Sequence, residues 1–338
     1  MVVILKSGSD NEEIGKVKAL SAQLGLSCHV SKGTERVVIG VIGDDRYTSA
    51  ERFEALDCVE QVMRVLKPYK LVSREFNSED LPVVLGDLSI GNGNFVIMAG
   101  PCAVEDRVMI EESAAFLSEM GIRIIRGGAF KPRTSPYSFQ GLGEQGLEYL
   151  REAADRYGLK TVTEVTGENT LDAVAATSDI LQIGARNSQN FNLIQKVAER
   201  DKPILLKRGF MNTVEELLLS AEYIASRGNM SIILCERGIR TFETATRNTL
   251  DISAIPILKS ESPLPVIIDP SHASGRRDLI VPLSRAAMAV GADGIEVEVH
   301  PRPENALSDS KQSLSFREFE GLLSSLRELA TSTELALT

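Results

Sequence analysis

Two rhythms of apolar and polar positions divide this sequence. In the first 65 residues, short apolar runs alternate with stretches whose apolar residues recur at helical spacing. This pattern predicts strands over residues 2–5, 27–31, 36–42 and 59–65 and helices over residues 12–24 and 49–55. The resulting βαββαβ order is the split βαβ arrangement of ferredoxin-like domains.

A short connecting region follows this first pattern. Residues 67–80 contain Pro68 and scattered charges, which are typical of a linker. Residues 82–90 precede the turn residues Gly91, Asn92 and Gly93, and we expect a hairpin there that closes one end of the next domain.

From residue 95 onward the sequence repeats one unit. Strand-like apolar runs begin near residues 95, 122, 160, 179, 203, 230, 264 and 294, with helical patterns between them. Alternating strands and helices predict a parallel sheet, and eight such units fit a closed (β/α)₈ TIM barrel. An open doubly wound sheet is the alternative, but it would need a glycine fingerprint where the sequence has Gly100, Pro101 and Cys102. The predicted α/β domains are therefore 1–66 (ferredoxin-like, regulatory), 67–94 (linker and hairpin) and 95–338 (catalytic barrel).

Composition excludes several classes of protein. Hydrophobic residues make up 43% and charged residues 25% of the chain, as in ordinary globular proteins. No apolar run is long enough to span a membrane, and the N-terminus turns polar too early for a secretory signal, so we expect a cytoplasmic protein. A net charge of -10 argues against nucleic acid as a partner. The 4 cysteines form no CxxC pair, which argues against a disulfide framework or a structural zinc site.

The predicted barrel strands end in cationic residues. Active sites of such barrels lie at the C-terminal ends of the strands. The cations found there are Arg126, Lys131, Arg133, Arg186, Lys207, Arg208 and Arg237. Any one of them could be a solvated surface charge, but together, in an acidic chain, they predict a site for a small multiply charged anion.

A second group of strand-end residues resembles a metal site. Cys102 follows the first barrel strand, His272 follows the seventh, Glu298 and His300 belong to the eighth, and Asp309 lies beyond it. Sulfur, nitrogen and oxygen donors suit a divalent transition ion such as manganese, iron, cobalt, zinc or copper. A lone histidine is nevertheless more often a structural residue than a ligand.

Three other residues have predicted inward positions. Glu296 shares a strand face with Glu298 and, being buried, must find a cation or hydrogen-bond donors; we predict a structural pairing. Glu164, near the end of the third strand, could orient arginine or lysine side chains. Cys235 is predicted to be a core thiol.

Several motifs carry a resemblance to one enzyme family. They are GPCAVE (100–105), RGGAFKPRTSPYSFQGLG (126–143), QIGARNSQNF (182–191), LLKRGF (205–210), CERGIRTFE (235–243), DPSHASGRRD (269–278) and EVEVHPRPENALSD (296–309). Together they resemble class I 3-deoxy-D-arabino-heptulosonate-7-phosphate (DAHP) synthases, in the subclass related to 3-deoxy-D-manno-octulosonate-8-phosphate (KDO8P) synthases. The resemblance covers the barrel and the first domain, which is similar to the ferredoxin-like regulatory domain of some of these enzymes.

The resemblance implies a transferase that condenses phosphoenolpyruvate with D-erythrose 4-phosphate, the first step of the shikimate pathway of aromatic amino acid biosynthesis. The implied phosphoenolpyruvate site consists of Arg126, Lys131 and Lys207 at the carboxylate, with Glu164 nearby, and Ala185, Arg186 and Arg237 at the phosphate. The implied erythrose 4-phosphate site consists of Arg133, Thr134 and Ser135. The implied metal ligands are Cys102, His272, Glu298 and Asp309, which leaves His300 without a ligand role; the implied catalytic group is Lys131, His272 and Cys102.

The family also implies regulation and assembly. We expect feedback inhibition by an aromatic amino acid, tyrosine or phenylalanine, bound to the first domain. His29 and Ser31 alternate on one strand face there and are the candidate contacts. We also expect a homotetramer.

Three alternatives remain at this point. A KDO8P synthase would use arabinose 5-phosphate, but its loop after the second strand resembles KANRSS, whereas residues 131–135 read KPRTS, and a regulatory domain is not expected there. An aldolase with Lys207 as a Schiff base would need a lowered lysine pKa, which the neighbouring Arg208 argues against. A non-catalytic sensor of aromatic amino acids would leave the strand-end residues unexplained.

Overall fold

The structure is a computed structural model, and it describes all residues except 34–35, 44–49, 64–66, 133–134, 334–335 and 338. The chain forms two compact units, one containing Met1–Glu79 with Glu261–Pro263 and the other containing Asp80–Ser260 with Leu264–Thr338. The predicted domain limits at residues 66 and 94 stay predictions.

The first unit contains an antiparallel sheet of four strands in the order β2-β3-β1-β4. Its elements are β1 (Val2–Leu5), α1 (Asn11–Gln23), β2 (Ser27–Lys32), β3 (Val37–Ile42), α2 (Glu51–Glu54) and β4 (Val59–Met63). Helix α1 begins at a capping box, in which Asp10 accepts from the Glu13 N–H and Glu13 accepts from the Asp10 N–H. The predicted βαββαβ order is confirmed; residues 49, 64 and 65 of the predicted elements lie outside the described residues.

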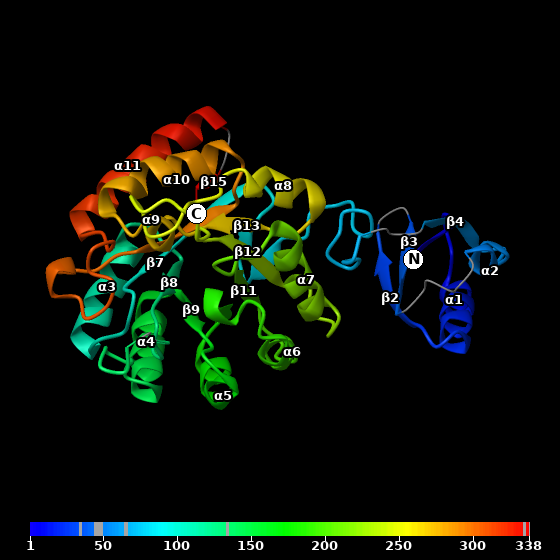
Figure 1. Cartoon of the computed structure of the whole chain (residues 1–338), viewed down its shortest axis with the longest axis horizontal. Coiled ribbons are helices and arrows are strands. Elements are labelled where there is room, and N and C mark those ends of the chain that lie inside the picture. Colours follow the sequence, from blue (N-terminus) through cyan, green and yellow to red (C-terminus); the bar gives the residue numbers. More distant parts are fainter. Residues whose placement is uncertain (34–35, 44–49, 64–66, 133–134, 334–335, 338) are drawn as a thin grey trace. The chain divides into compact units, whose positions relative to one another are not determined.

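The second unit is a closed barrel of eight parallel strands (Figure 1). The strands are β7 (Asn94–Gly100), β8 (Ile124–Arg126), β9 (Lys160–Glu164), β10 (Ile180–Ile183), β11 (Ile204–Lys207), β12 (Ile232–Glu236), β13 (Val266–Ile268) and β14 (Gly294–Glu298). Strand β14 pairs with β7 and closes the ring. The predicted (β/α)₈ fold is confirmed, and the open doubly wound alternative is wrong.

Helices surround these strands in Figure 1. They are α3 (Arg107–Glu119), α4 (Glu144–Tyr157), α5 (Glu168–Thr177), α6 (Phe191–Ala198), α7 (Val214–Ala225), α8 (Ala254–Glu261), α9 (Pro270–Ser274), α10 (Ile280–Ala289) and α11 (Phe316–Thr333). Three 3₁₀ turns are η1 (Ala185–Asn187), η2 (Arg277–Leu279) and η3 (Pro303–Asn305). A last strand, β15 (Ala336–Leu337), pairs with the start of β7; two residues are too short for the sequence pattern to predict.

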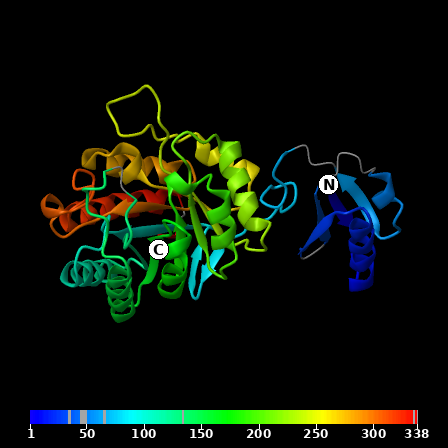
Figure 2. The ribbon, with the colours of Figure 1, turned by 60° about the horizontal axis from the view of Figure 1, so that its bottom comes forward.

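An apolar layer fills one end of the barrel. The hairpin of β5 (Val83–Leu85) and β6 (Leu88–Ile90), visible in cyan in Figure 2, packs its side chains against inward residues of the barrel strands. The cluster includes Met98, Ile124 and the thiol of Cys235, as predicted for a core cysteine. Because this end is closed by hydrophobic side chains, the polar inward residues gather at the opposite, C-terminal end of the strands.

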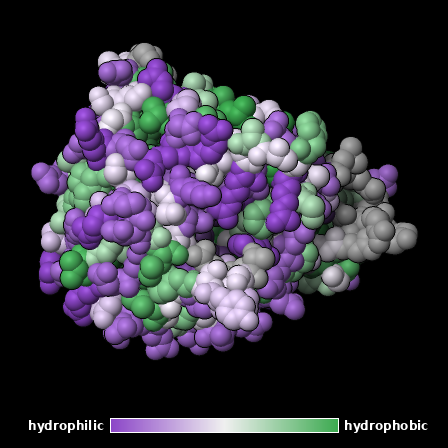
Figure 3. Space-filling view, turned by 60° about the vertical axis from the view of Figure 1, so that its left-hand side comes forward, coloured by the Kyte–Doolittle hydropathy of each residue, from purple (hydrophilic) through white to green (hydrophobic). Residues whose placement is uncertain are grey.

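The outer surface is mixed in character. On the face seen in Figure 3, hydrophilic and hydrophobic residues are interspersed. Among the described helices, none is long and apolar enough to cross a membrane.

Candidate active site at the C-terminal ends of the barrel strands

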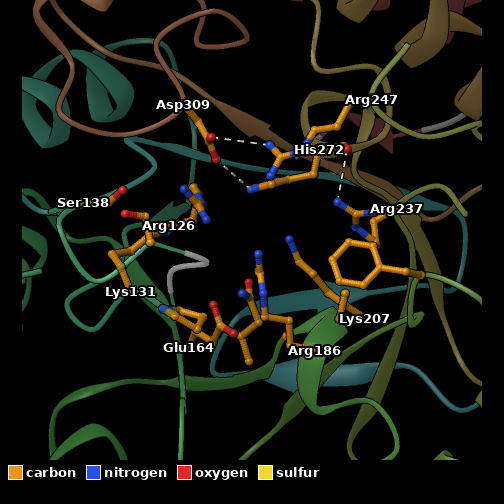
Figure 4. A pocket seen from close by; sticks show the side chains of 16 residues that line it. Arg126, Lys131, Ser138, Glu164, Arg186, Lys207, Arg237, Arg247, His272 and Asp309 are labelled. Atoms are coloured by element: carbon orange, nitrogen blue, oxygen red, sulfur yellow. Dashed lines mark hydrogen bonds and ion pairs between the residues drawn. The ribbon is translucent and has the colours of Figure 1, made fainter. Parts of the chain in front are cut away.

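A pocket of about 260 Å³ opens at the C-terminal ends of the strands (Figure 4). Its lining includes the predicted site residues Arg126, Lys131, Ser135, Glu164, Ala185, Arg186, Lys207, Arg237, His272 and Asp309. Arg133 and Thr134 lie outside the described residues. The structure therefore brings together in one pocket side chains that are far apart in the sequence.

Two cations form the floor of this pocket. Arg126, the last residue of β8, donates to Glu296 at 3.2 Å and to Glu298 at 3.3 Å. Lys207, the last residue of β11, has its Nζ atom 2.5 Å from carboxylate oxygens of both Asp269 and Glu296. Glu296 thus bridges the two floor cations, Arg126 and Lys207, in the structural pairing that the sequence predicts.

The floor carboxylates keep Lys207 charged. Burial alone would lower the pKa of Lys207, but attraction to Asp269 and Glu296 outweighs burial and raises it. A Schiff-base lysine needs a deprotonated amine, so this environment opposes the aldolase alternative.

Arg208 does not belong to the pocket, and its prediction as a strand-end site cation is wrong. Its guanidinium lies 2.6 Å from Glu236 and 2.9 Å from Asp251, and it does not line the pocket. Successive residues of an extended chain point to opposite sides. Since Lys207 points inward, Arg208 points outward into a structural ion-pair network.

Three other cations, Lys131, Arg186 and Arg237, form the rim of the pocket. The guanidiniums of Arg186 and Arg237 lie over the ring of Phe210, 5.6 and 4.8 Å from its centroid. Lys131 donates to the carbonyl oxygen of Cys102 at 2.9 Å. Among the described residues, no carboxylate lies within ion-pair distance of any rim cation. These cations therefore face the pocket with positive charge that no side chain there neutralises.

Glu164 occupies a position that a glycine makes available. It is the last residue of β9, and a Cβ atom at Gly184 would stand 1.9 Å from its Oε1 atom. Glu164 forms no ion pair within the described part of the chain, so its predicted role in orienting cations stays a prediction. Ala185 follows directly and begins the turn η1 beside the pocket.

Four potential metal ligands converge beside the floor. One donor atom from each of Cys102, His272, Glu298 and Asp309 lies within 4.8 Å of all the others. His272 Nε2 is 3.2 Å from Glu298 Oε1, and Cys102 Sγ is 3.4 Å from Asp309 Oδ2. The four side chains come from the loop after β7, from α9, from β14 and from the loop beyond β14. Their convergence is the arrangement that the sequence predicts for a single ion.

Two residues that sequence reasoning missed orient this cluster. Asp269 caps α9 by accepting from the His272 N–H at 2.9 Å, and its other oxygen lies 2.6 Å from His272 Nδ1. Because Asp269 contacts Nδ1 of His272, the other ring nitrogen, Nε2, faces the donor cluster. Gln312 donates to Glu298 Oε2 at 2.6 Å. The sequence signal for Asp269 is its place before Pro270 at a helix start.

The donor set fits a divalent cation on electrostatic grounds. Burial, together with nearby Glu298 and Asp309, raises the pKa of Cys102 to about 12. Burial also works to raise the pKa of Asp309, but attraction to His272, Arg247 and Lys131 outweighs it and lowers the pKa to about 2. A metal ion supplies the positive charge that lets a buried thiol bind as thiolate. The residue types also match transition ions rather than calcium.

Arg247 is a further pocket residue that the sequence analysis missed. Its guanidinium lies 3.4 Å from Asp309 and 3.1 Å from Gln312. Figure 4 shows Arg247, His272 and Asp309 across the pocket from Arg186 and Glu164. Arg247 comes from the irregular segment between β12 and α8, where no periodic pattern marks an inward position.

The candidate regulatory residues lie in the first unit. His29 and Ser31 are both on β2. The His29 ring lies 5.9 Å from the ring of Phe76, centroid to centroid, and Ser31 donates to Asn77 at 3.0 Å. Their role as effector contacts stays a prediction.

The barrel, the rim cations and the donor cluster together have the features of an enzyme with a cationic pocket beside four potential metal ligands. Comparison with known proteins identifies the family. Residues 70–335 match the DAHP synthetase I family, and residues 1–67 match the DAHP synthase ferredoxin-like domain. The chain belongs to the DAHP synthetase I family.

Relatives of two kinds resemble this chain. A phospho-2-dehydro-3-deoxyheptonate aldolase of Thermotoga maritima is 66% identical over 330 residues, covering 98% of each chain. A 2-dehydro-3-deoxyphosphooctonate aldolase of Francisella tularensis is 33% identical and covers 72% of this chain and 95% of its own length. The crystal structure of a Thermotoga maritima DAHP synthase has 64% identity and a TM-score of 0.81, covering 100% of this chain and 99% of that chain. A truncated form of the Thermotoga enzyme, 61% identical, covers 80% of this chain and 99% of its own with a TM-score of 0.76.

Proposed function

We propose that this chain is a DAHP synthase, a transferase that joins phosphoenolpyruvate, D-erythrose 4-phosphate and water to give DAHP and inorganic phosphate. The observation that carries the proposal is the presence of three rim cations, without carboxylate partners among the described residues, in the same pocket as the donor cluster. Substrates with two phosphates and one carboxylate match this charge pattern.

The pocket residues divide the substrates between them in this proposal. Arg186, Arg237 and the Ala185 N–H hold the phosphate of phosphoenolpyruvate, while Lys131 and the floor cations face its carboxylate. Arg133, Thr134 and Ser135 hold erythrose 4-phosphate. Holding two anions in attack geometry overcomes their repulsion and can supply roughly 7–11 kcal/mol of the barrier.

The chemistry is a carbon–carbon bond formation followed by loss of phosphate. C3 of phosphoenolpyruvate bonds to the aldehyde carbon, water adds at C2, and phosphate leaves with cleavage of its C–O bond. Lys131 lines the pocket and is the proposed side-chain group for proton transfer; His272, with Nδ1 against Asp269, would hold the ion through Nε2.

A divalent ion, manganese, iron, cobalt, zinc or copper, belongs to the proposal. Cys102, His272, Glu298 and Asp309 would hold it, and it would supply Lewis-acid polarisation of a substrate oxygen. Asp269 holds the imidazole of His272 so that Nε2 faces this position.

The KDO8P synthase alternative is less well supported. The chain is 66% identical to a phospho-2-dehydro-3-deoxyheptonate aldolase but 33% identical to a 2-dehydro-3-deoxyphosphooctonate aldolase, and its first 67 residues match a DAHP synthase domain. The test is phosphate release from phosphoenolpyruvate with erythrose 4-phosphate or arabinose 5-phosphate in parallel. We expect turnover with erythrose 4-phosphate; turnover with arabinose 5-phosphate alone would reverse the assignment.

Regulation forms the last part of the proposal. Tyrosine or phenylalanine binds the ferredoxin-like domain near His29 and Ser31 and inhibits a cytoplasmic homotetramer. Deleting residues 1–65 should leave catalysis intact and remove inhibition, measured as rate against added amino acid. A truncated enzyme that is still inhibited would refute this assignment, and light scattering tests the tetramer.

A further inference from the structure

His300 is a buried histidine without a role in the donor cluster. Its side chain is 4% exposed, and the Arg302 N–H donates to its Nδ1 atom at 3.0 Å. A backbone N–H can only donate, so the neutral ring carries its proton on Nε2. Nε2 is buried and makes no hydrogen bond of good geometry within the described part of the chain. The carboxylate facing it is Glu105, whose Oε2 atom lies 3.4 Å away.

Glu105 reaches the same loop at a second point. It lies three residues after Cys102, in the segment between β7 and α3. Its Oε1 atom accepts a hydrogen bond from the Leu307 N–H at 2.8 Å. Leu307 is two residues before Asp309. One carboxylate, with its side chain 9% exposed, thus contacts both the start of the loop after β14 and the part that carries Asp309.

The loop needs such support where Asp309 lies. Its base is closed, because the His300 N–H donates to Leu314 at 2.9 Å and the Leu314 N–H donates to Glu298 at 2.8 Å. Asp309 itself has a φ of 51°, in the left-handed region that residues other than glycine adopt at a cost. The neighbouring Ser308 hydroxyl lies 2.9 Å from Cys102 Sγ. Contacts beyond the base must therefore hold Asp309 against Cys102.

We propose that Glu105 and His300 are positioning residues that hold Asp309 beside Cys102, so that the donor atoms stand ready for a metal ion. This inference rests on the proposed metal site. Each carboxylate oxygen of Glu105 faces one group of the loop, the Leu307 N–H and the His300 Nε2–H. Removing the carboxylate takes the acceptor from the Leu307 N–H and the facing oxygen from His300 Nε2, and so frees the loop to move. Mutation of a residue that supports a metal ligand typically weakens metal binding by about 10- to 100-fold.

The test measures affinity of the full-length, metal-free protein for Co²⁺ by competition with a colorimetric chelator. Glu105→Ala should weaken Co²⁺ binding by about 10- to 100-fold. Glu112→Ala is the matched control, because Glu112 also binds this loop, through Arg302 at 3.0 Å, but on the exposed surface. We expect the control to bind Co²⁺ within about twofold of the unchanged protein. A double variant with His300→Gln should lose less than the product of the two single effects, since both act through one contact.

Urea unfolding of the metal-free variants separates positioning from stability. A loss of Co²⁺ affinity with an unfolding midpoint equal to that of Glu112→Ala supports the proposal. If Glu105→Ala does not fold, Glu105→Gln is the deciding variant, because its one amide oxygen can face only one of the two loop groups. Weaker Co²⁺ binding by Glu105→Gln supports the proposal, and unchanged binding overturns it. Unchanged affinity in a folded Glu105→Ala also overturns it. Failure of the metal site itself has a different signature, namely equal Co²⁺ binding by the unchanged protein and by Cys102→Ala.

Discussion

The floor and the rim of the pocket both contain arginine and lysine, but only the floor cations are paired with carboxylates. The floor cations Arg126 and Lys207 are almost fully buried, and each contacts two carboxylates. The rim cations Lys131, Arg186 and Arg237 have no carboxylate within ion-pair distance among the described residues. A paired cation holds its partners in place and offers a ligand only part of its charge, whereas the charge of an unpaired cation is fully available.

This difference assigns separate tasks to the two layers. In the floor, carboxylates offset the cost of burying the charges, and the pairing fixes Glu296 and Asp269 behind the donor cluster and Glu298 within it. In the rim, aromatic stacking and carbonyl contacts hold the guanidiniums without neutralising them. Substrate anions would provide the missing charge.

The largest effect should follow from breaking the floor. Glu296→Ala leaves Arg126 and Lys207 each with one carboxylate fewer, and unpairing buried charges costs about 3–5 kcal/mol. We expect the free energy of unfolding, measured with urea, to fall by that amount. Replacing the exposed Glu304 by alanine is the control and should leave it unchanged. A loss under about 1 kcal/mol at Glu296 would mean that the floor pairs do not hold the site.

Removing a rim cation should instead affect substrate binding. Charge-assisted hydrogen bonds contribute about 1.5–3 kcal/mol, so Arg186→Ala should raise KM for phosphoenolpyruvate about 10- to 100-fold while the unfolding midpoint stays constant. Arg240 stacks on the same Phe210 ring at 4.7 Å but does not line the pocket. Arg240→Ala should therefore leave KM within about twofold. An equal rise in KM for Arg186→Ala and Arg240→Ala would contradict the assignment of Arg186 to the substrate-binding rim.

The rim was within reach of sequence analysis, but the pairing in the floor was not. Lys131, Arg186 and Arg237 each follow an apolar run, and strand ends of a parallel barrel meet at one face. Lys207 also ends an apolar run, but its partners Asp269 and Glu296 lie more than 60 residues away along the chain. Which carboxylate meets which cation depends on the register between strands, which a single sequence does not express.

Local signals explain the remaining differences. Alternation along a strand predicts that Arg208 points away when Lys207 points inward. This rule identifies Arg208 as the predicted strand-end cation, among those in the described part of the chain, that does not line the pocket. Arg247 has no such signal, because it lies in an irregular loop. Asp309 is predictable by family resemblance, but its left-handed backbone is visible only in the structure.

The smallest effect concerns a pair far from the site. Burial works to raise the pKa of Asp179, but hydrogen bonds from Arg151 and Thr161 outweigh burial and lower it. A pKa lower in the folded than in the unfolded chain stabilises the fold above about pH 4, and the contribution is lost as the pH falls through the folded pKa. Asp179→Asn should make urea stability fall less steeply between about pH 4 and pH 2. Asp155→Asn, at an exposed contact with the same arginine, should keep the original slope; identical slopes in both variants would contradict this.

The central claim is that Cys102, His272, Glu298 and Asp309 surround one ion on which the condensation depends. The most direct test is to remove bound metal with a chelator, add back Mn²⁺ in known amounts and follow DAHP formation from phosphoenolpyruvate and erythrose 4-phosphate. The account predicts no turnover without metal and recovery that saturates at one ion per chain. A metal-free protein that retains its full rate would contradict it.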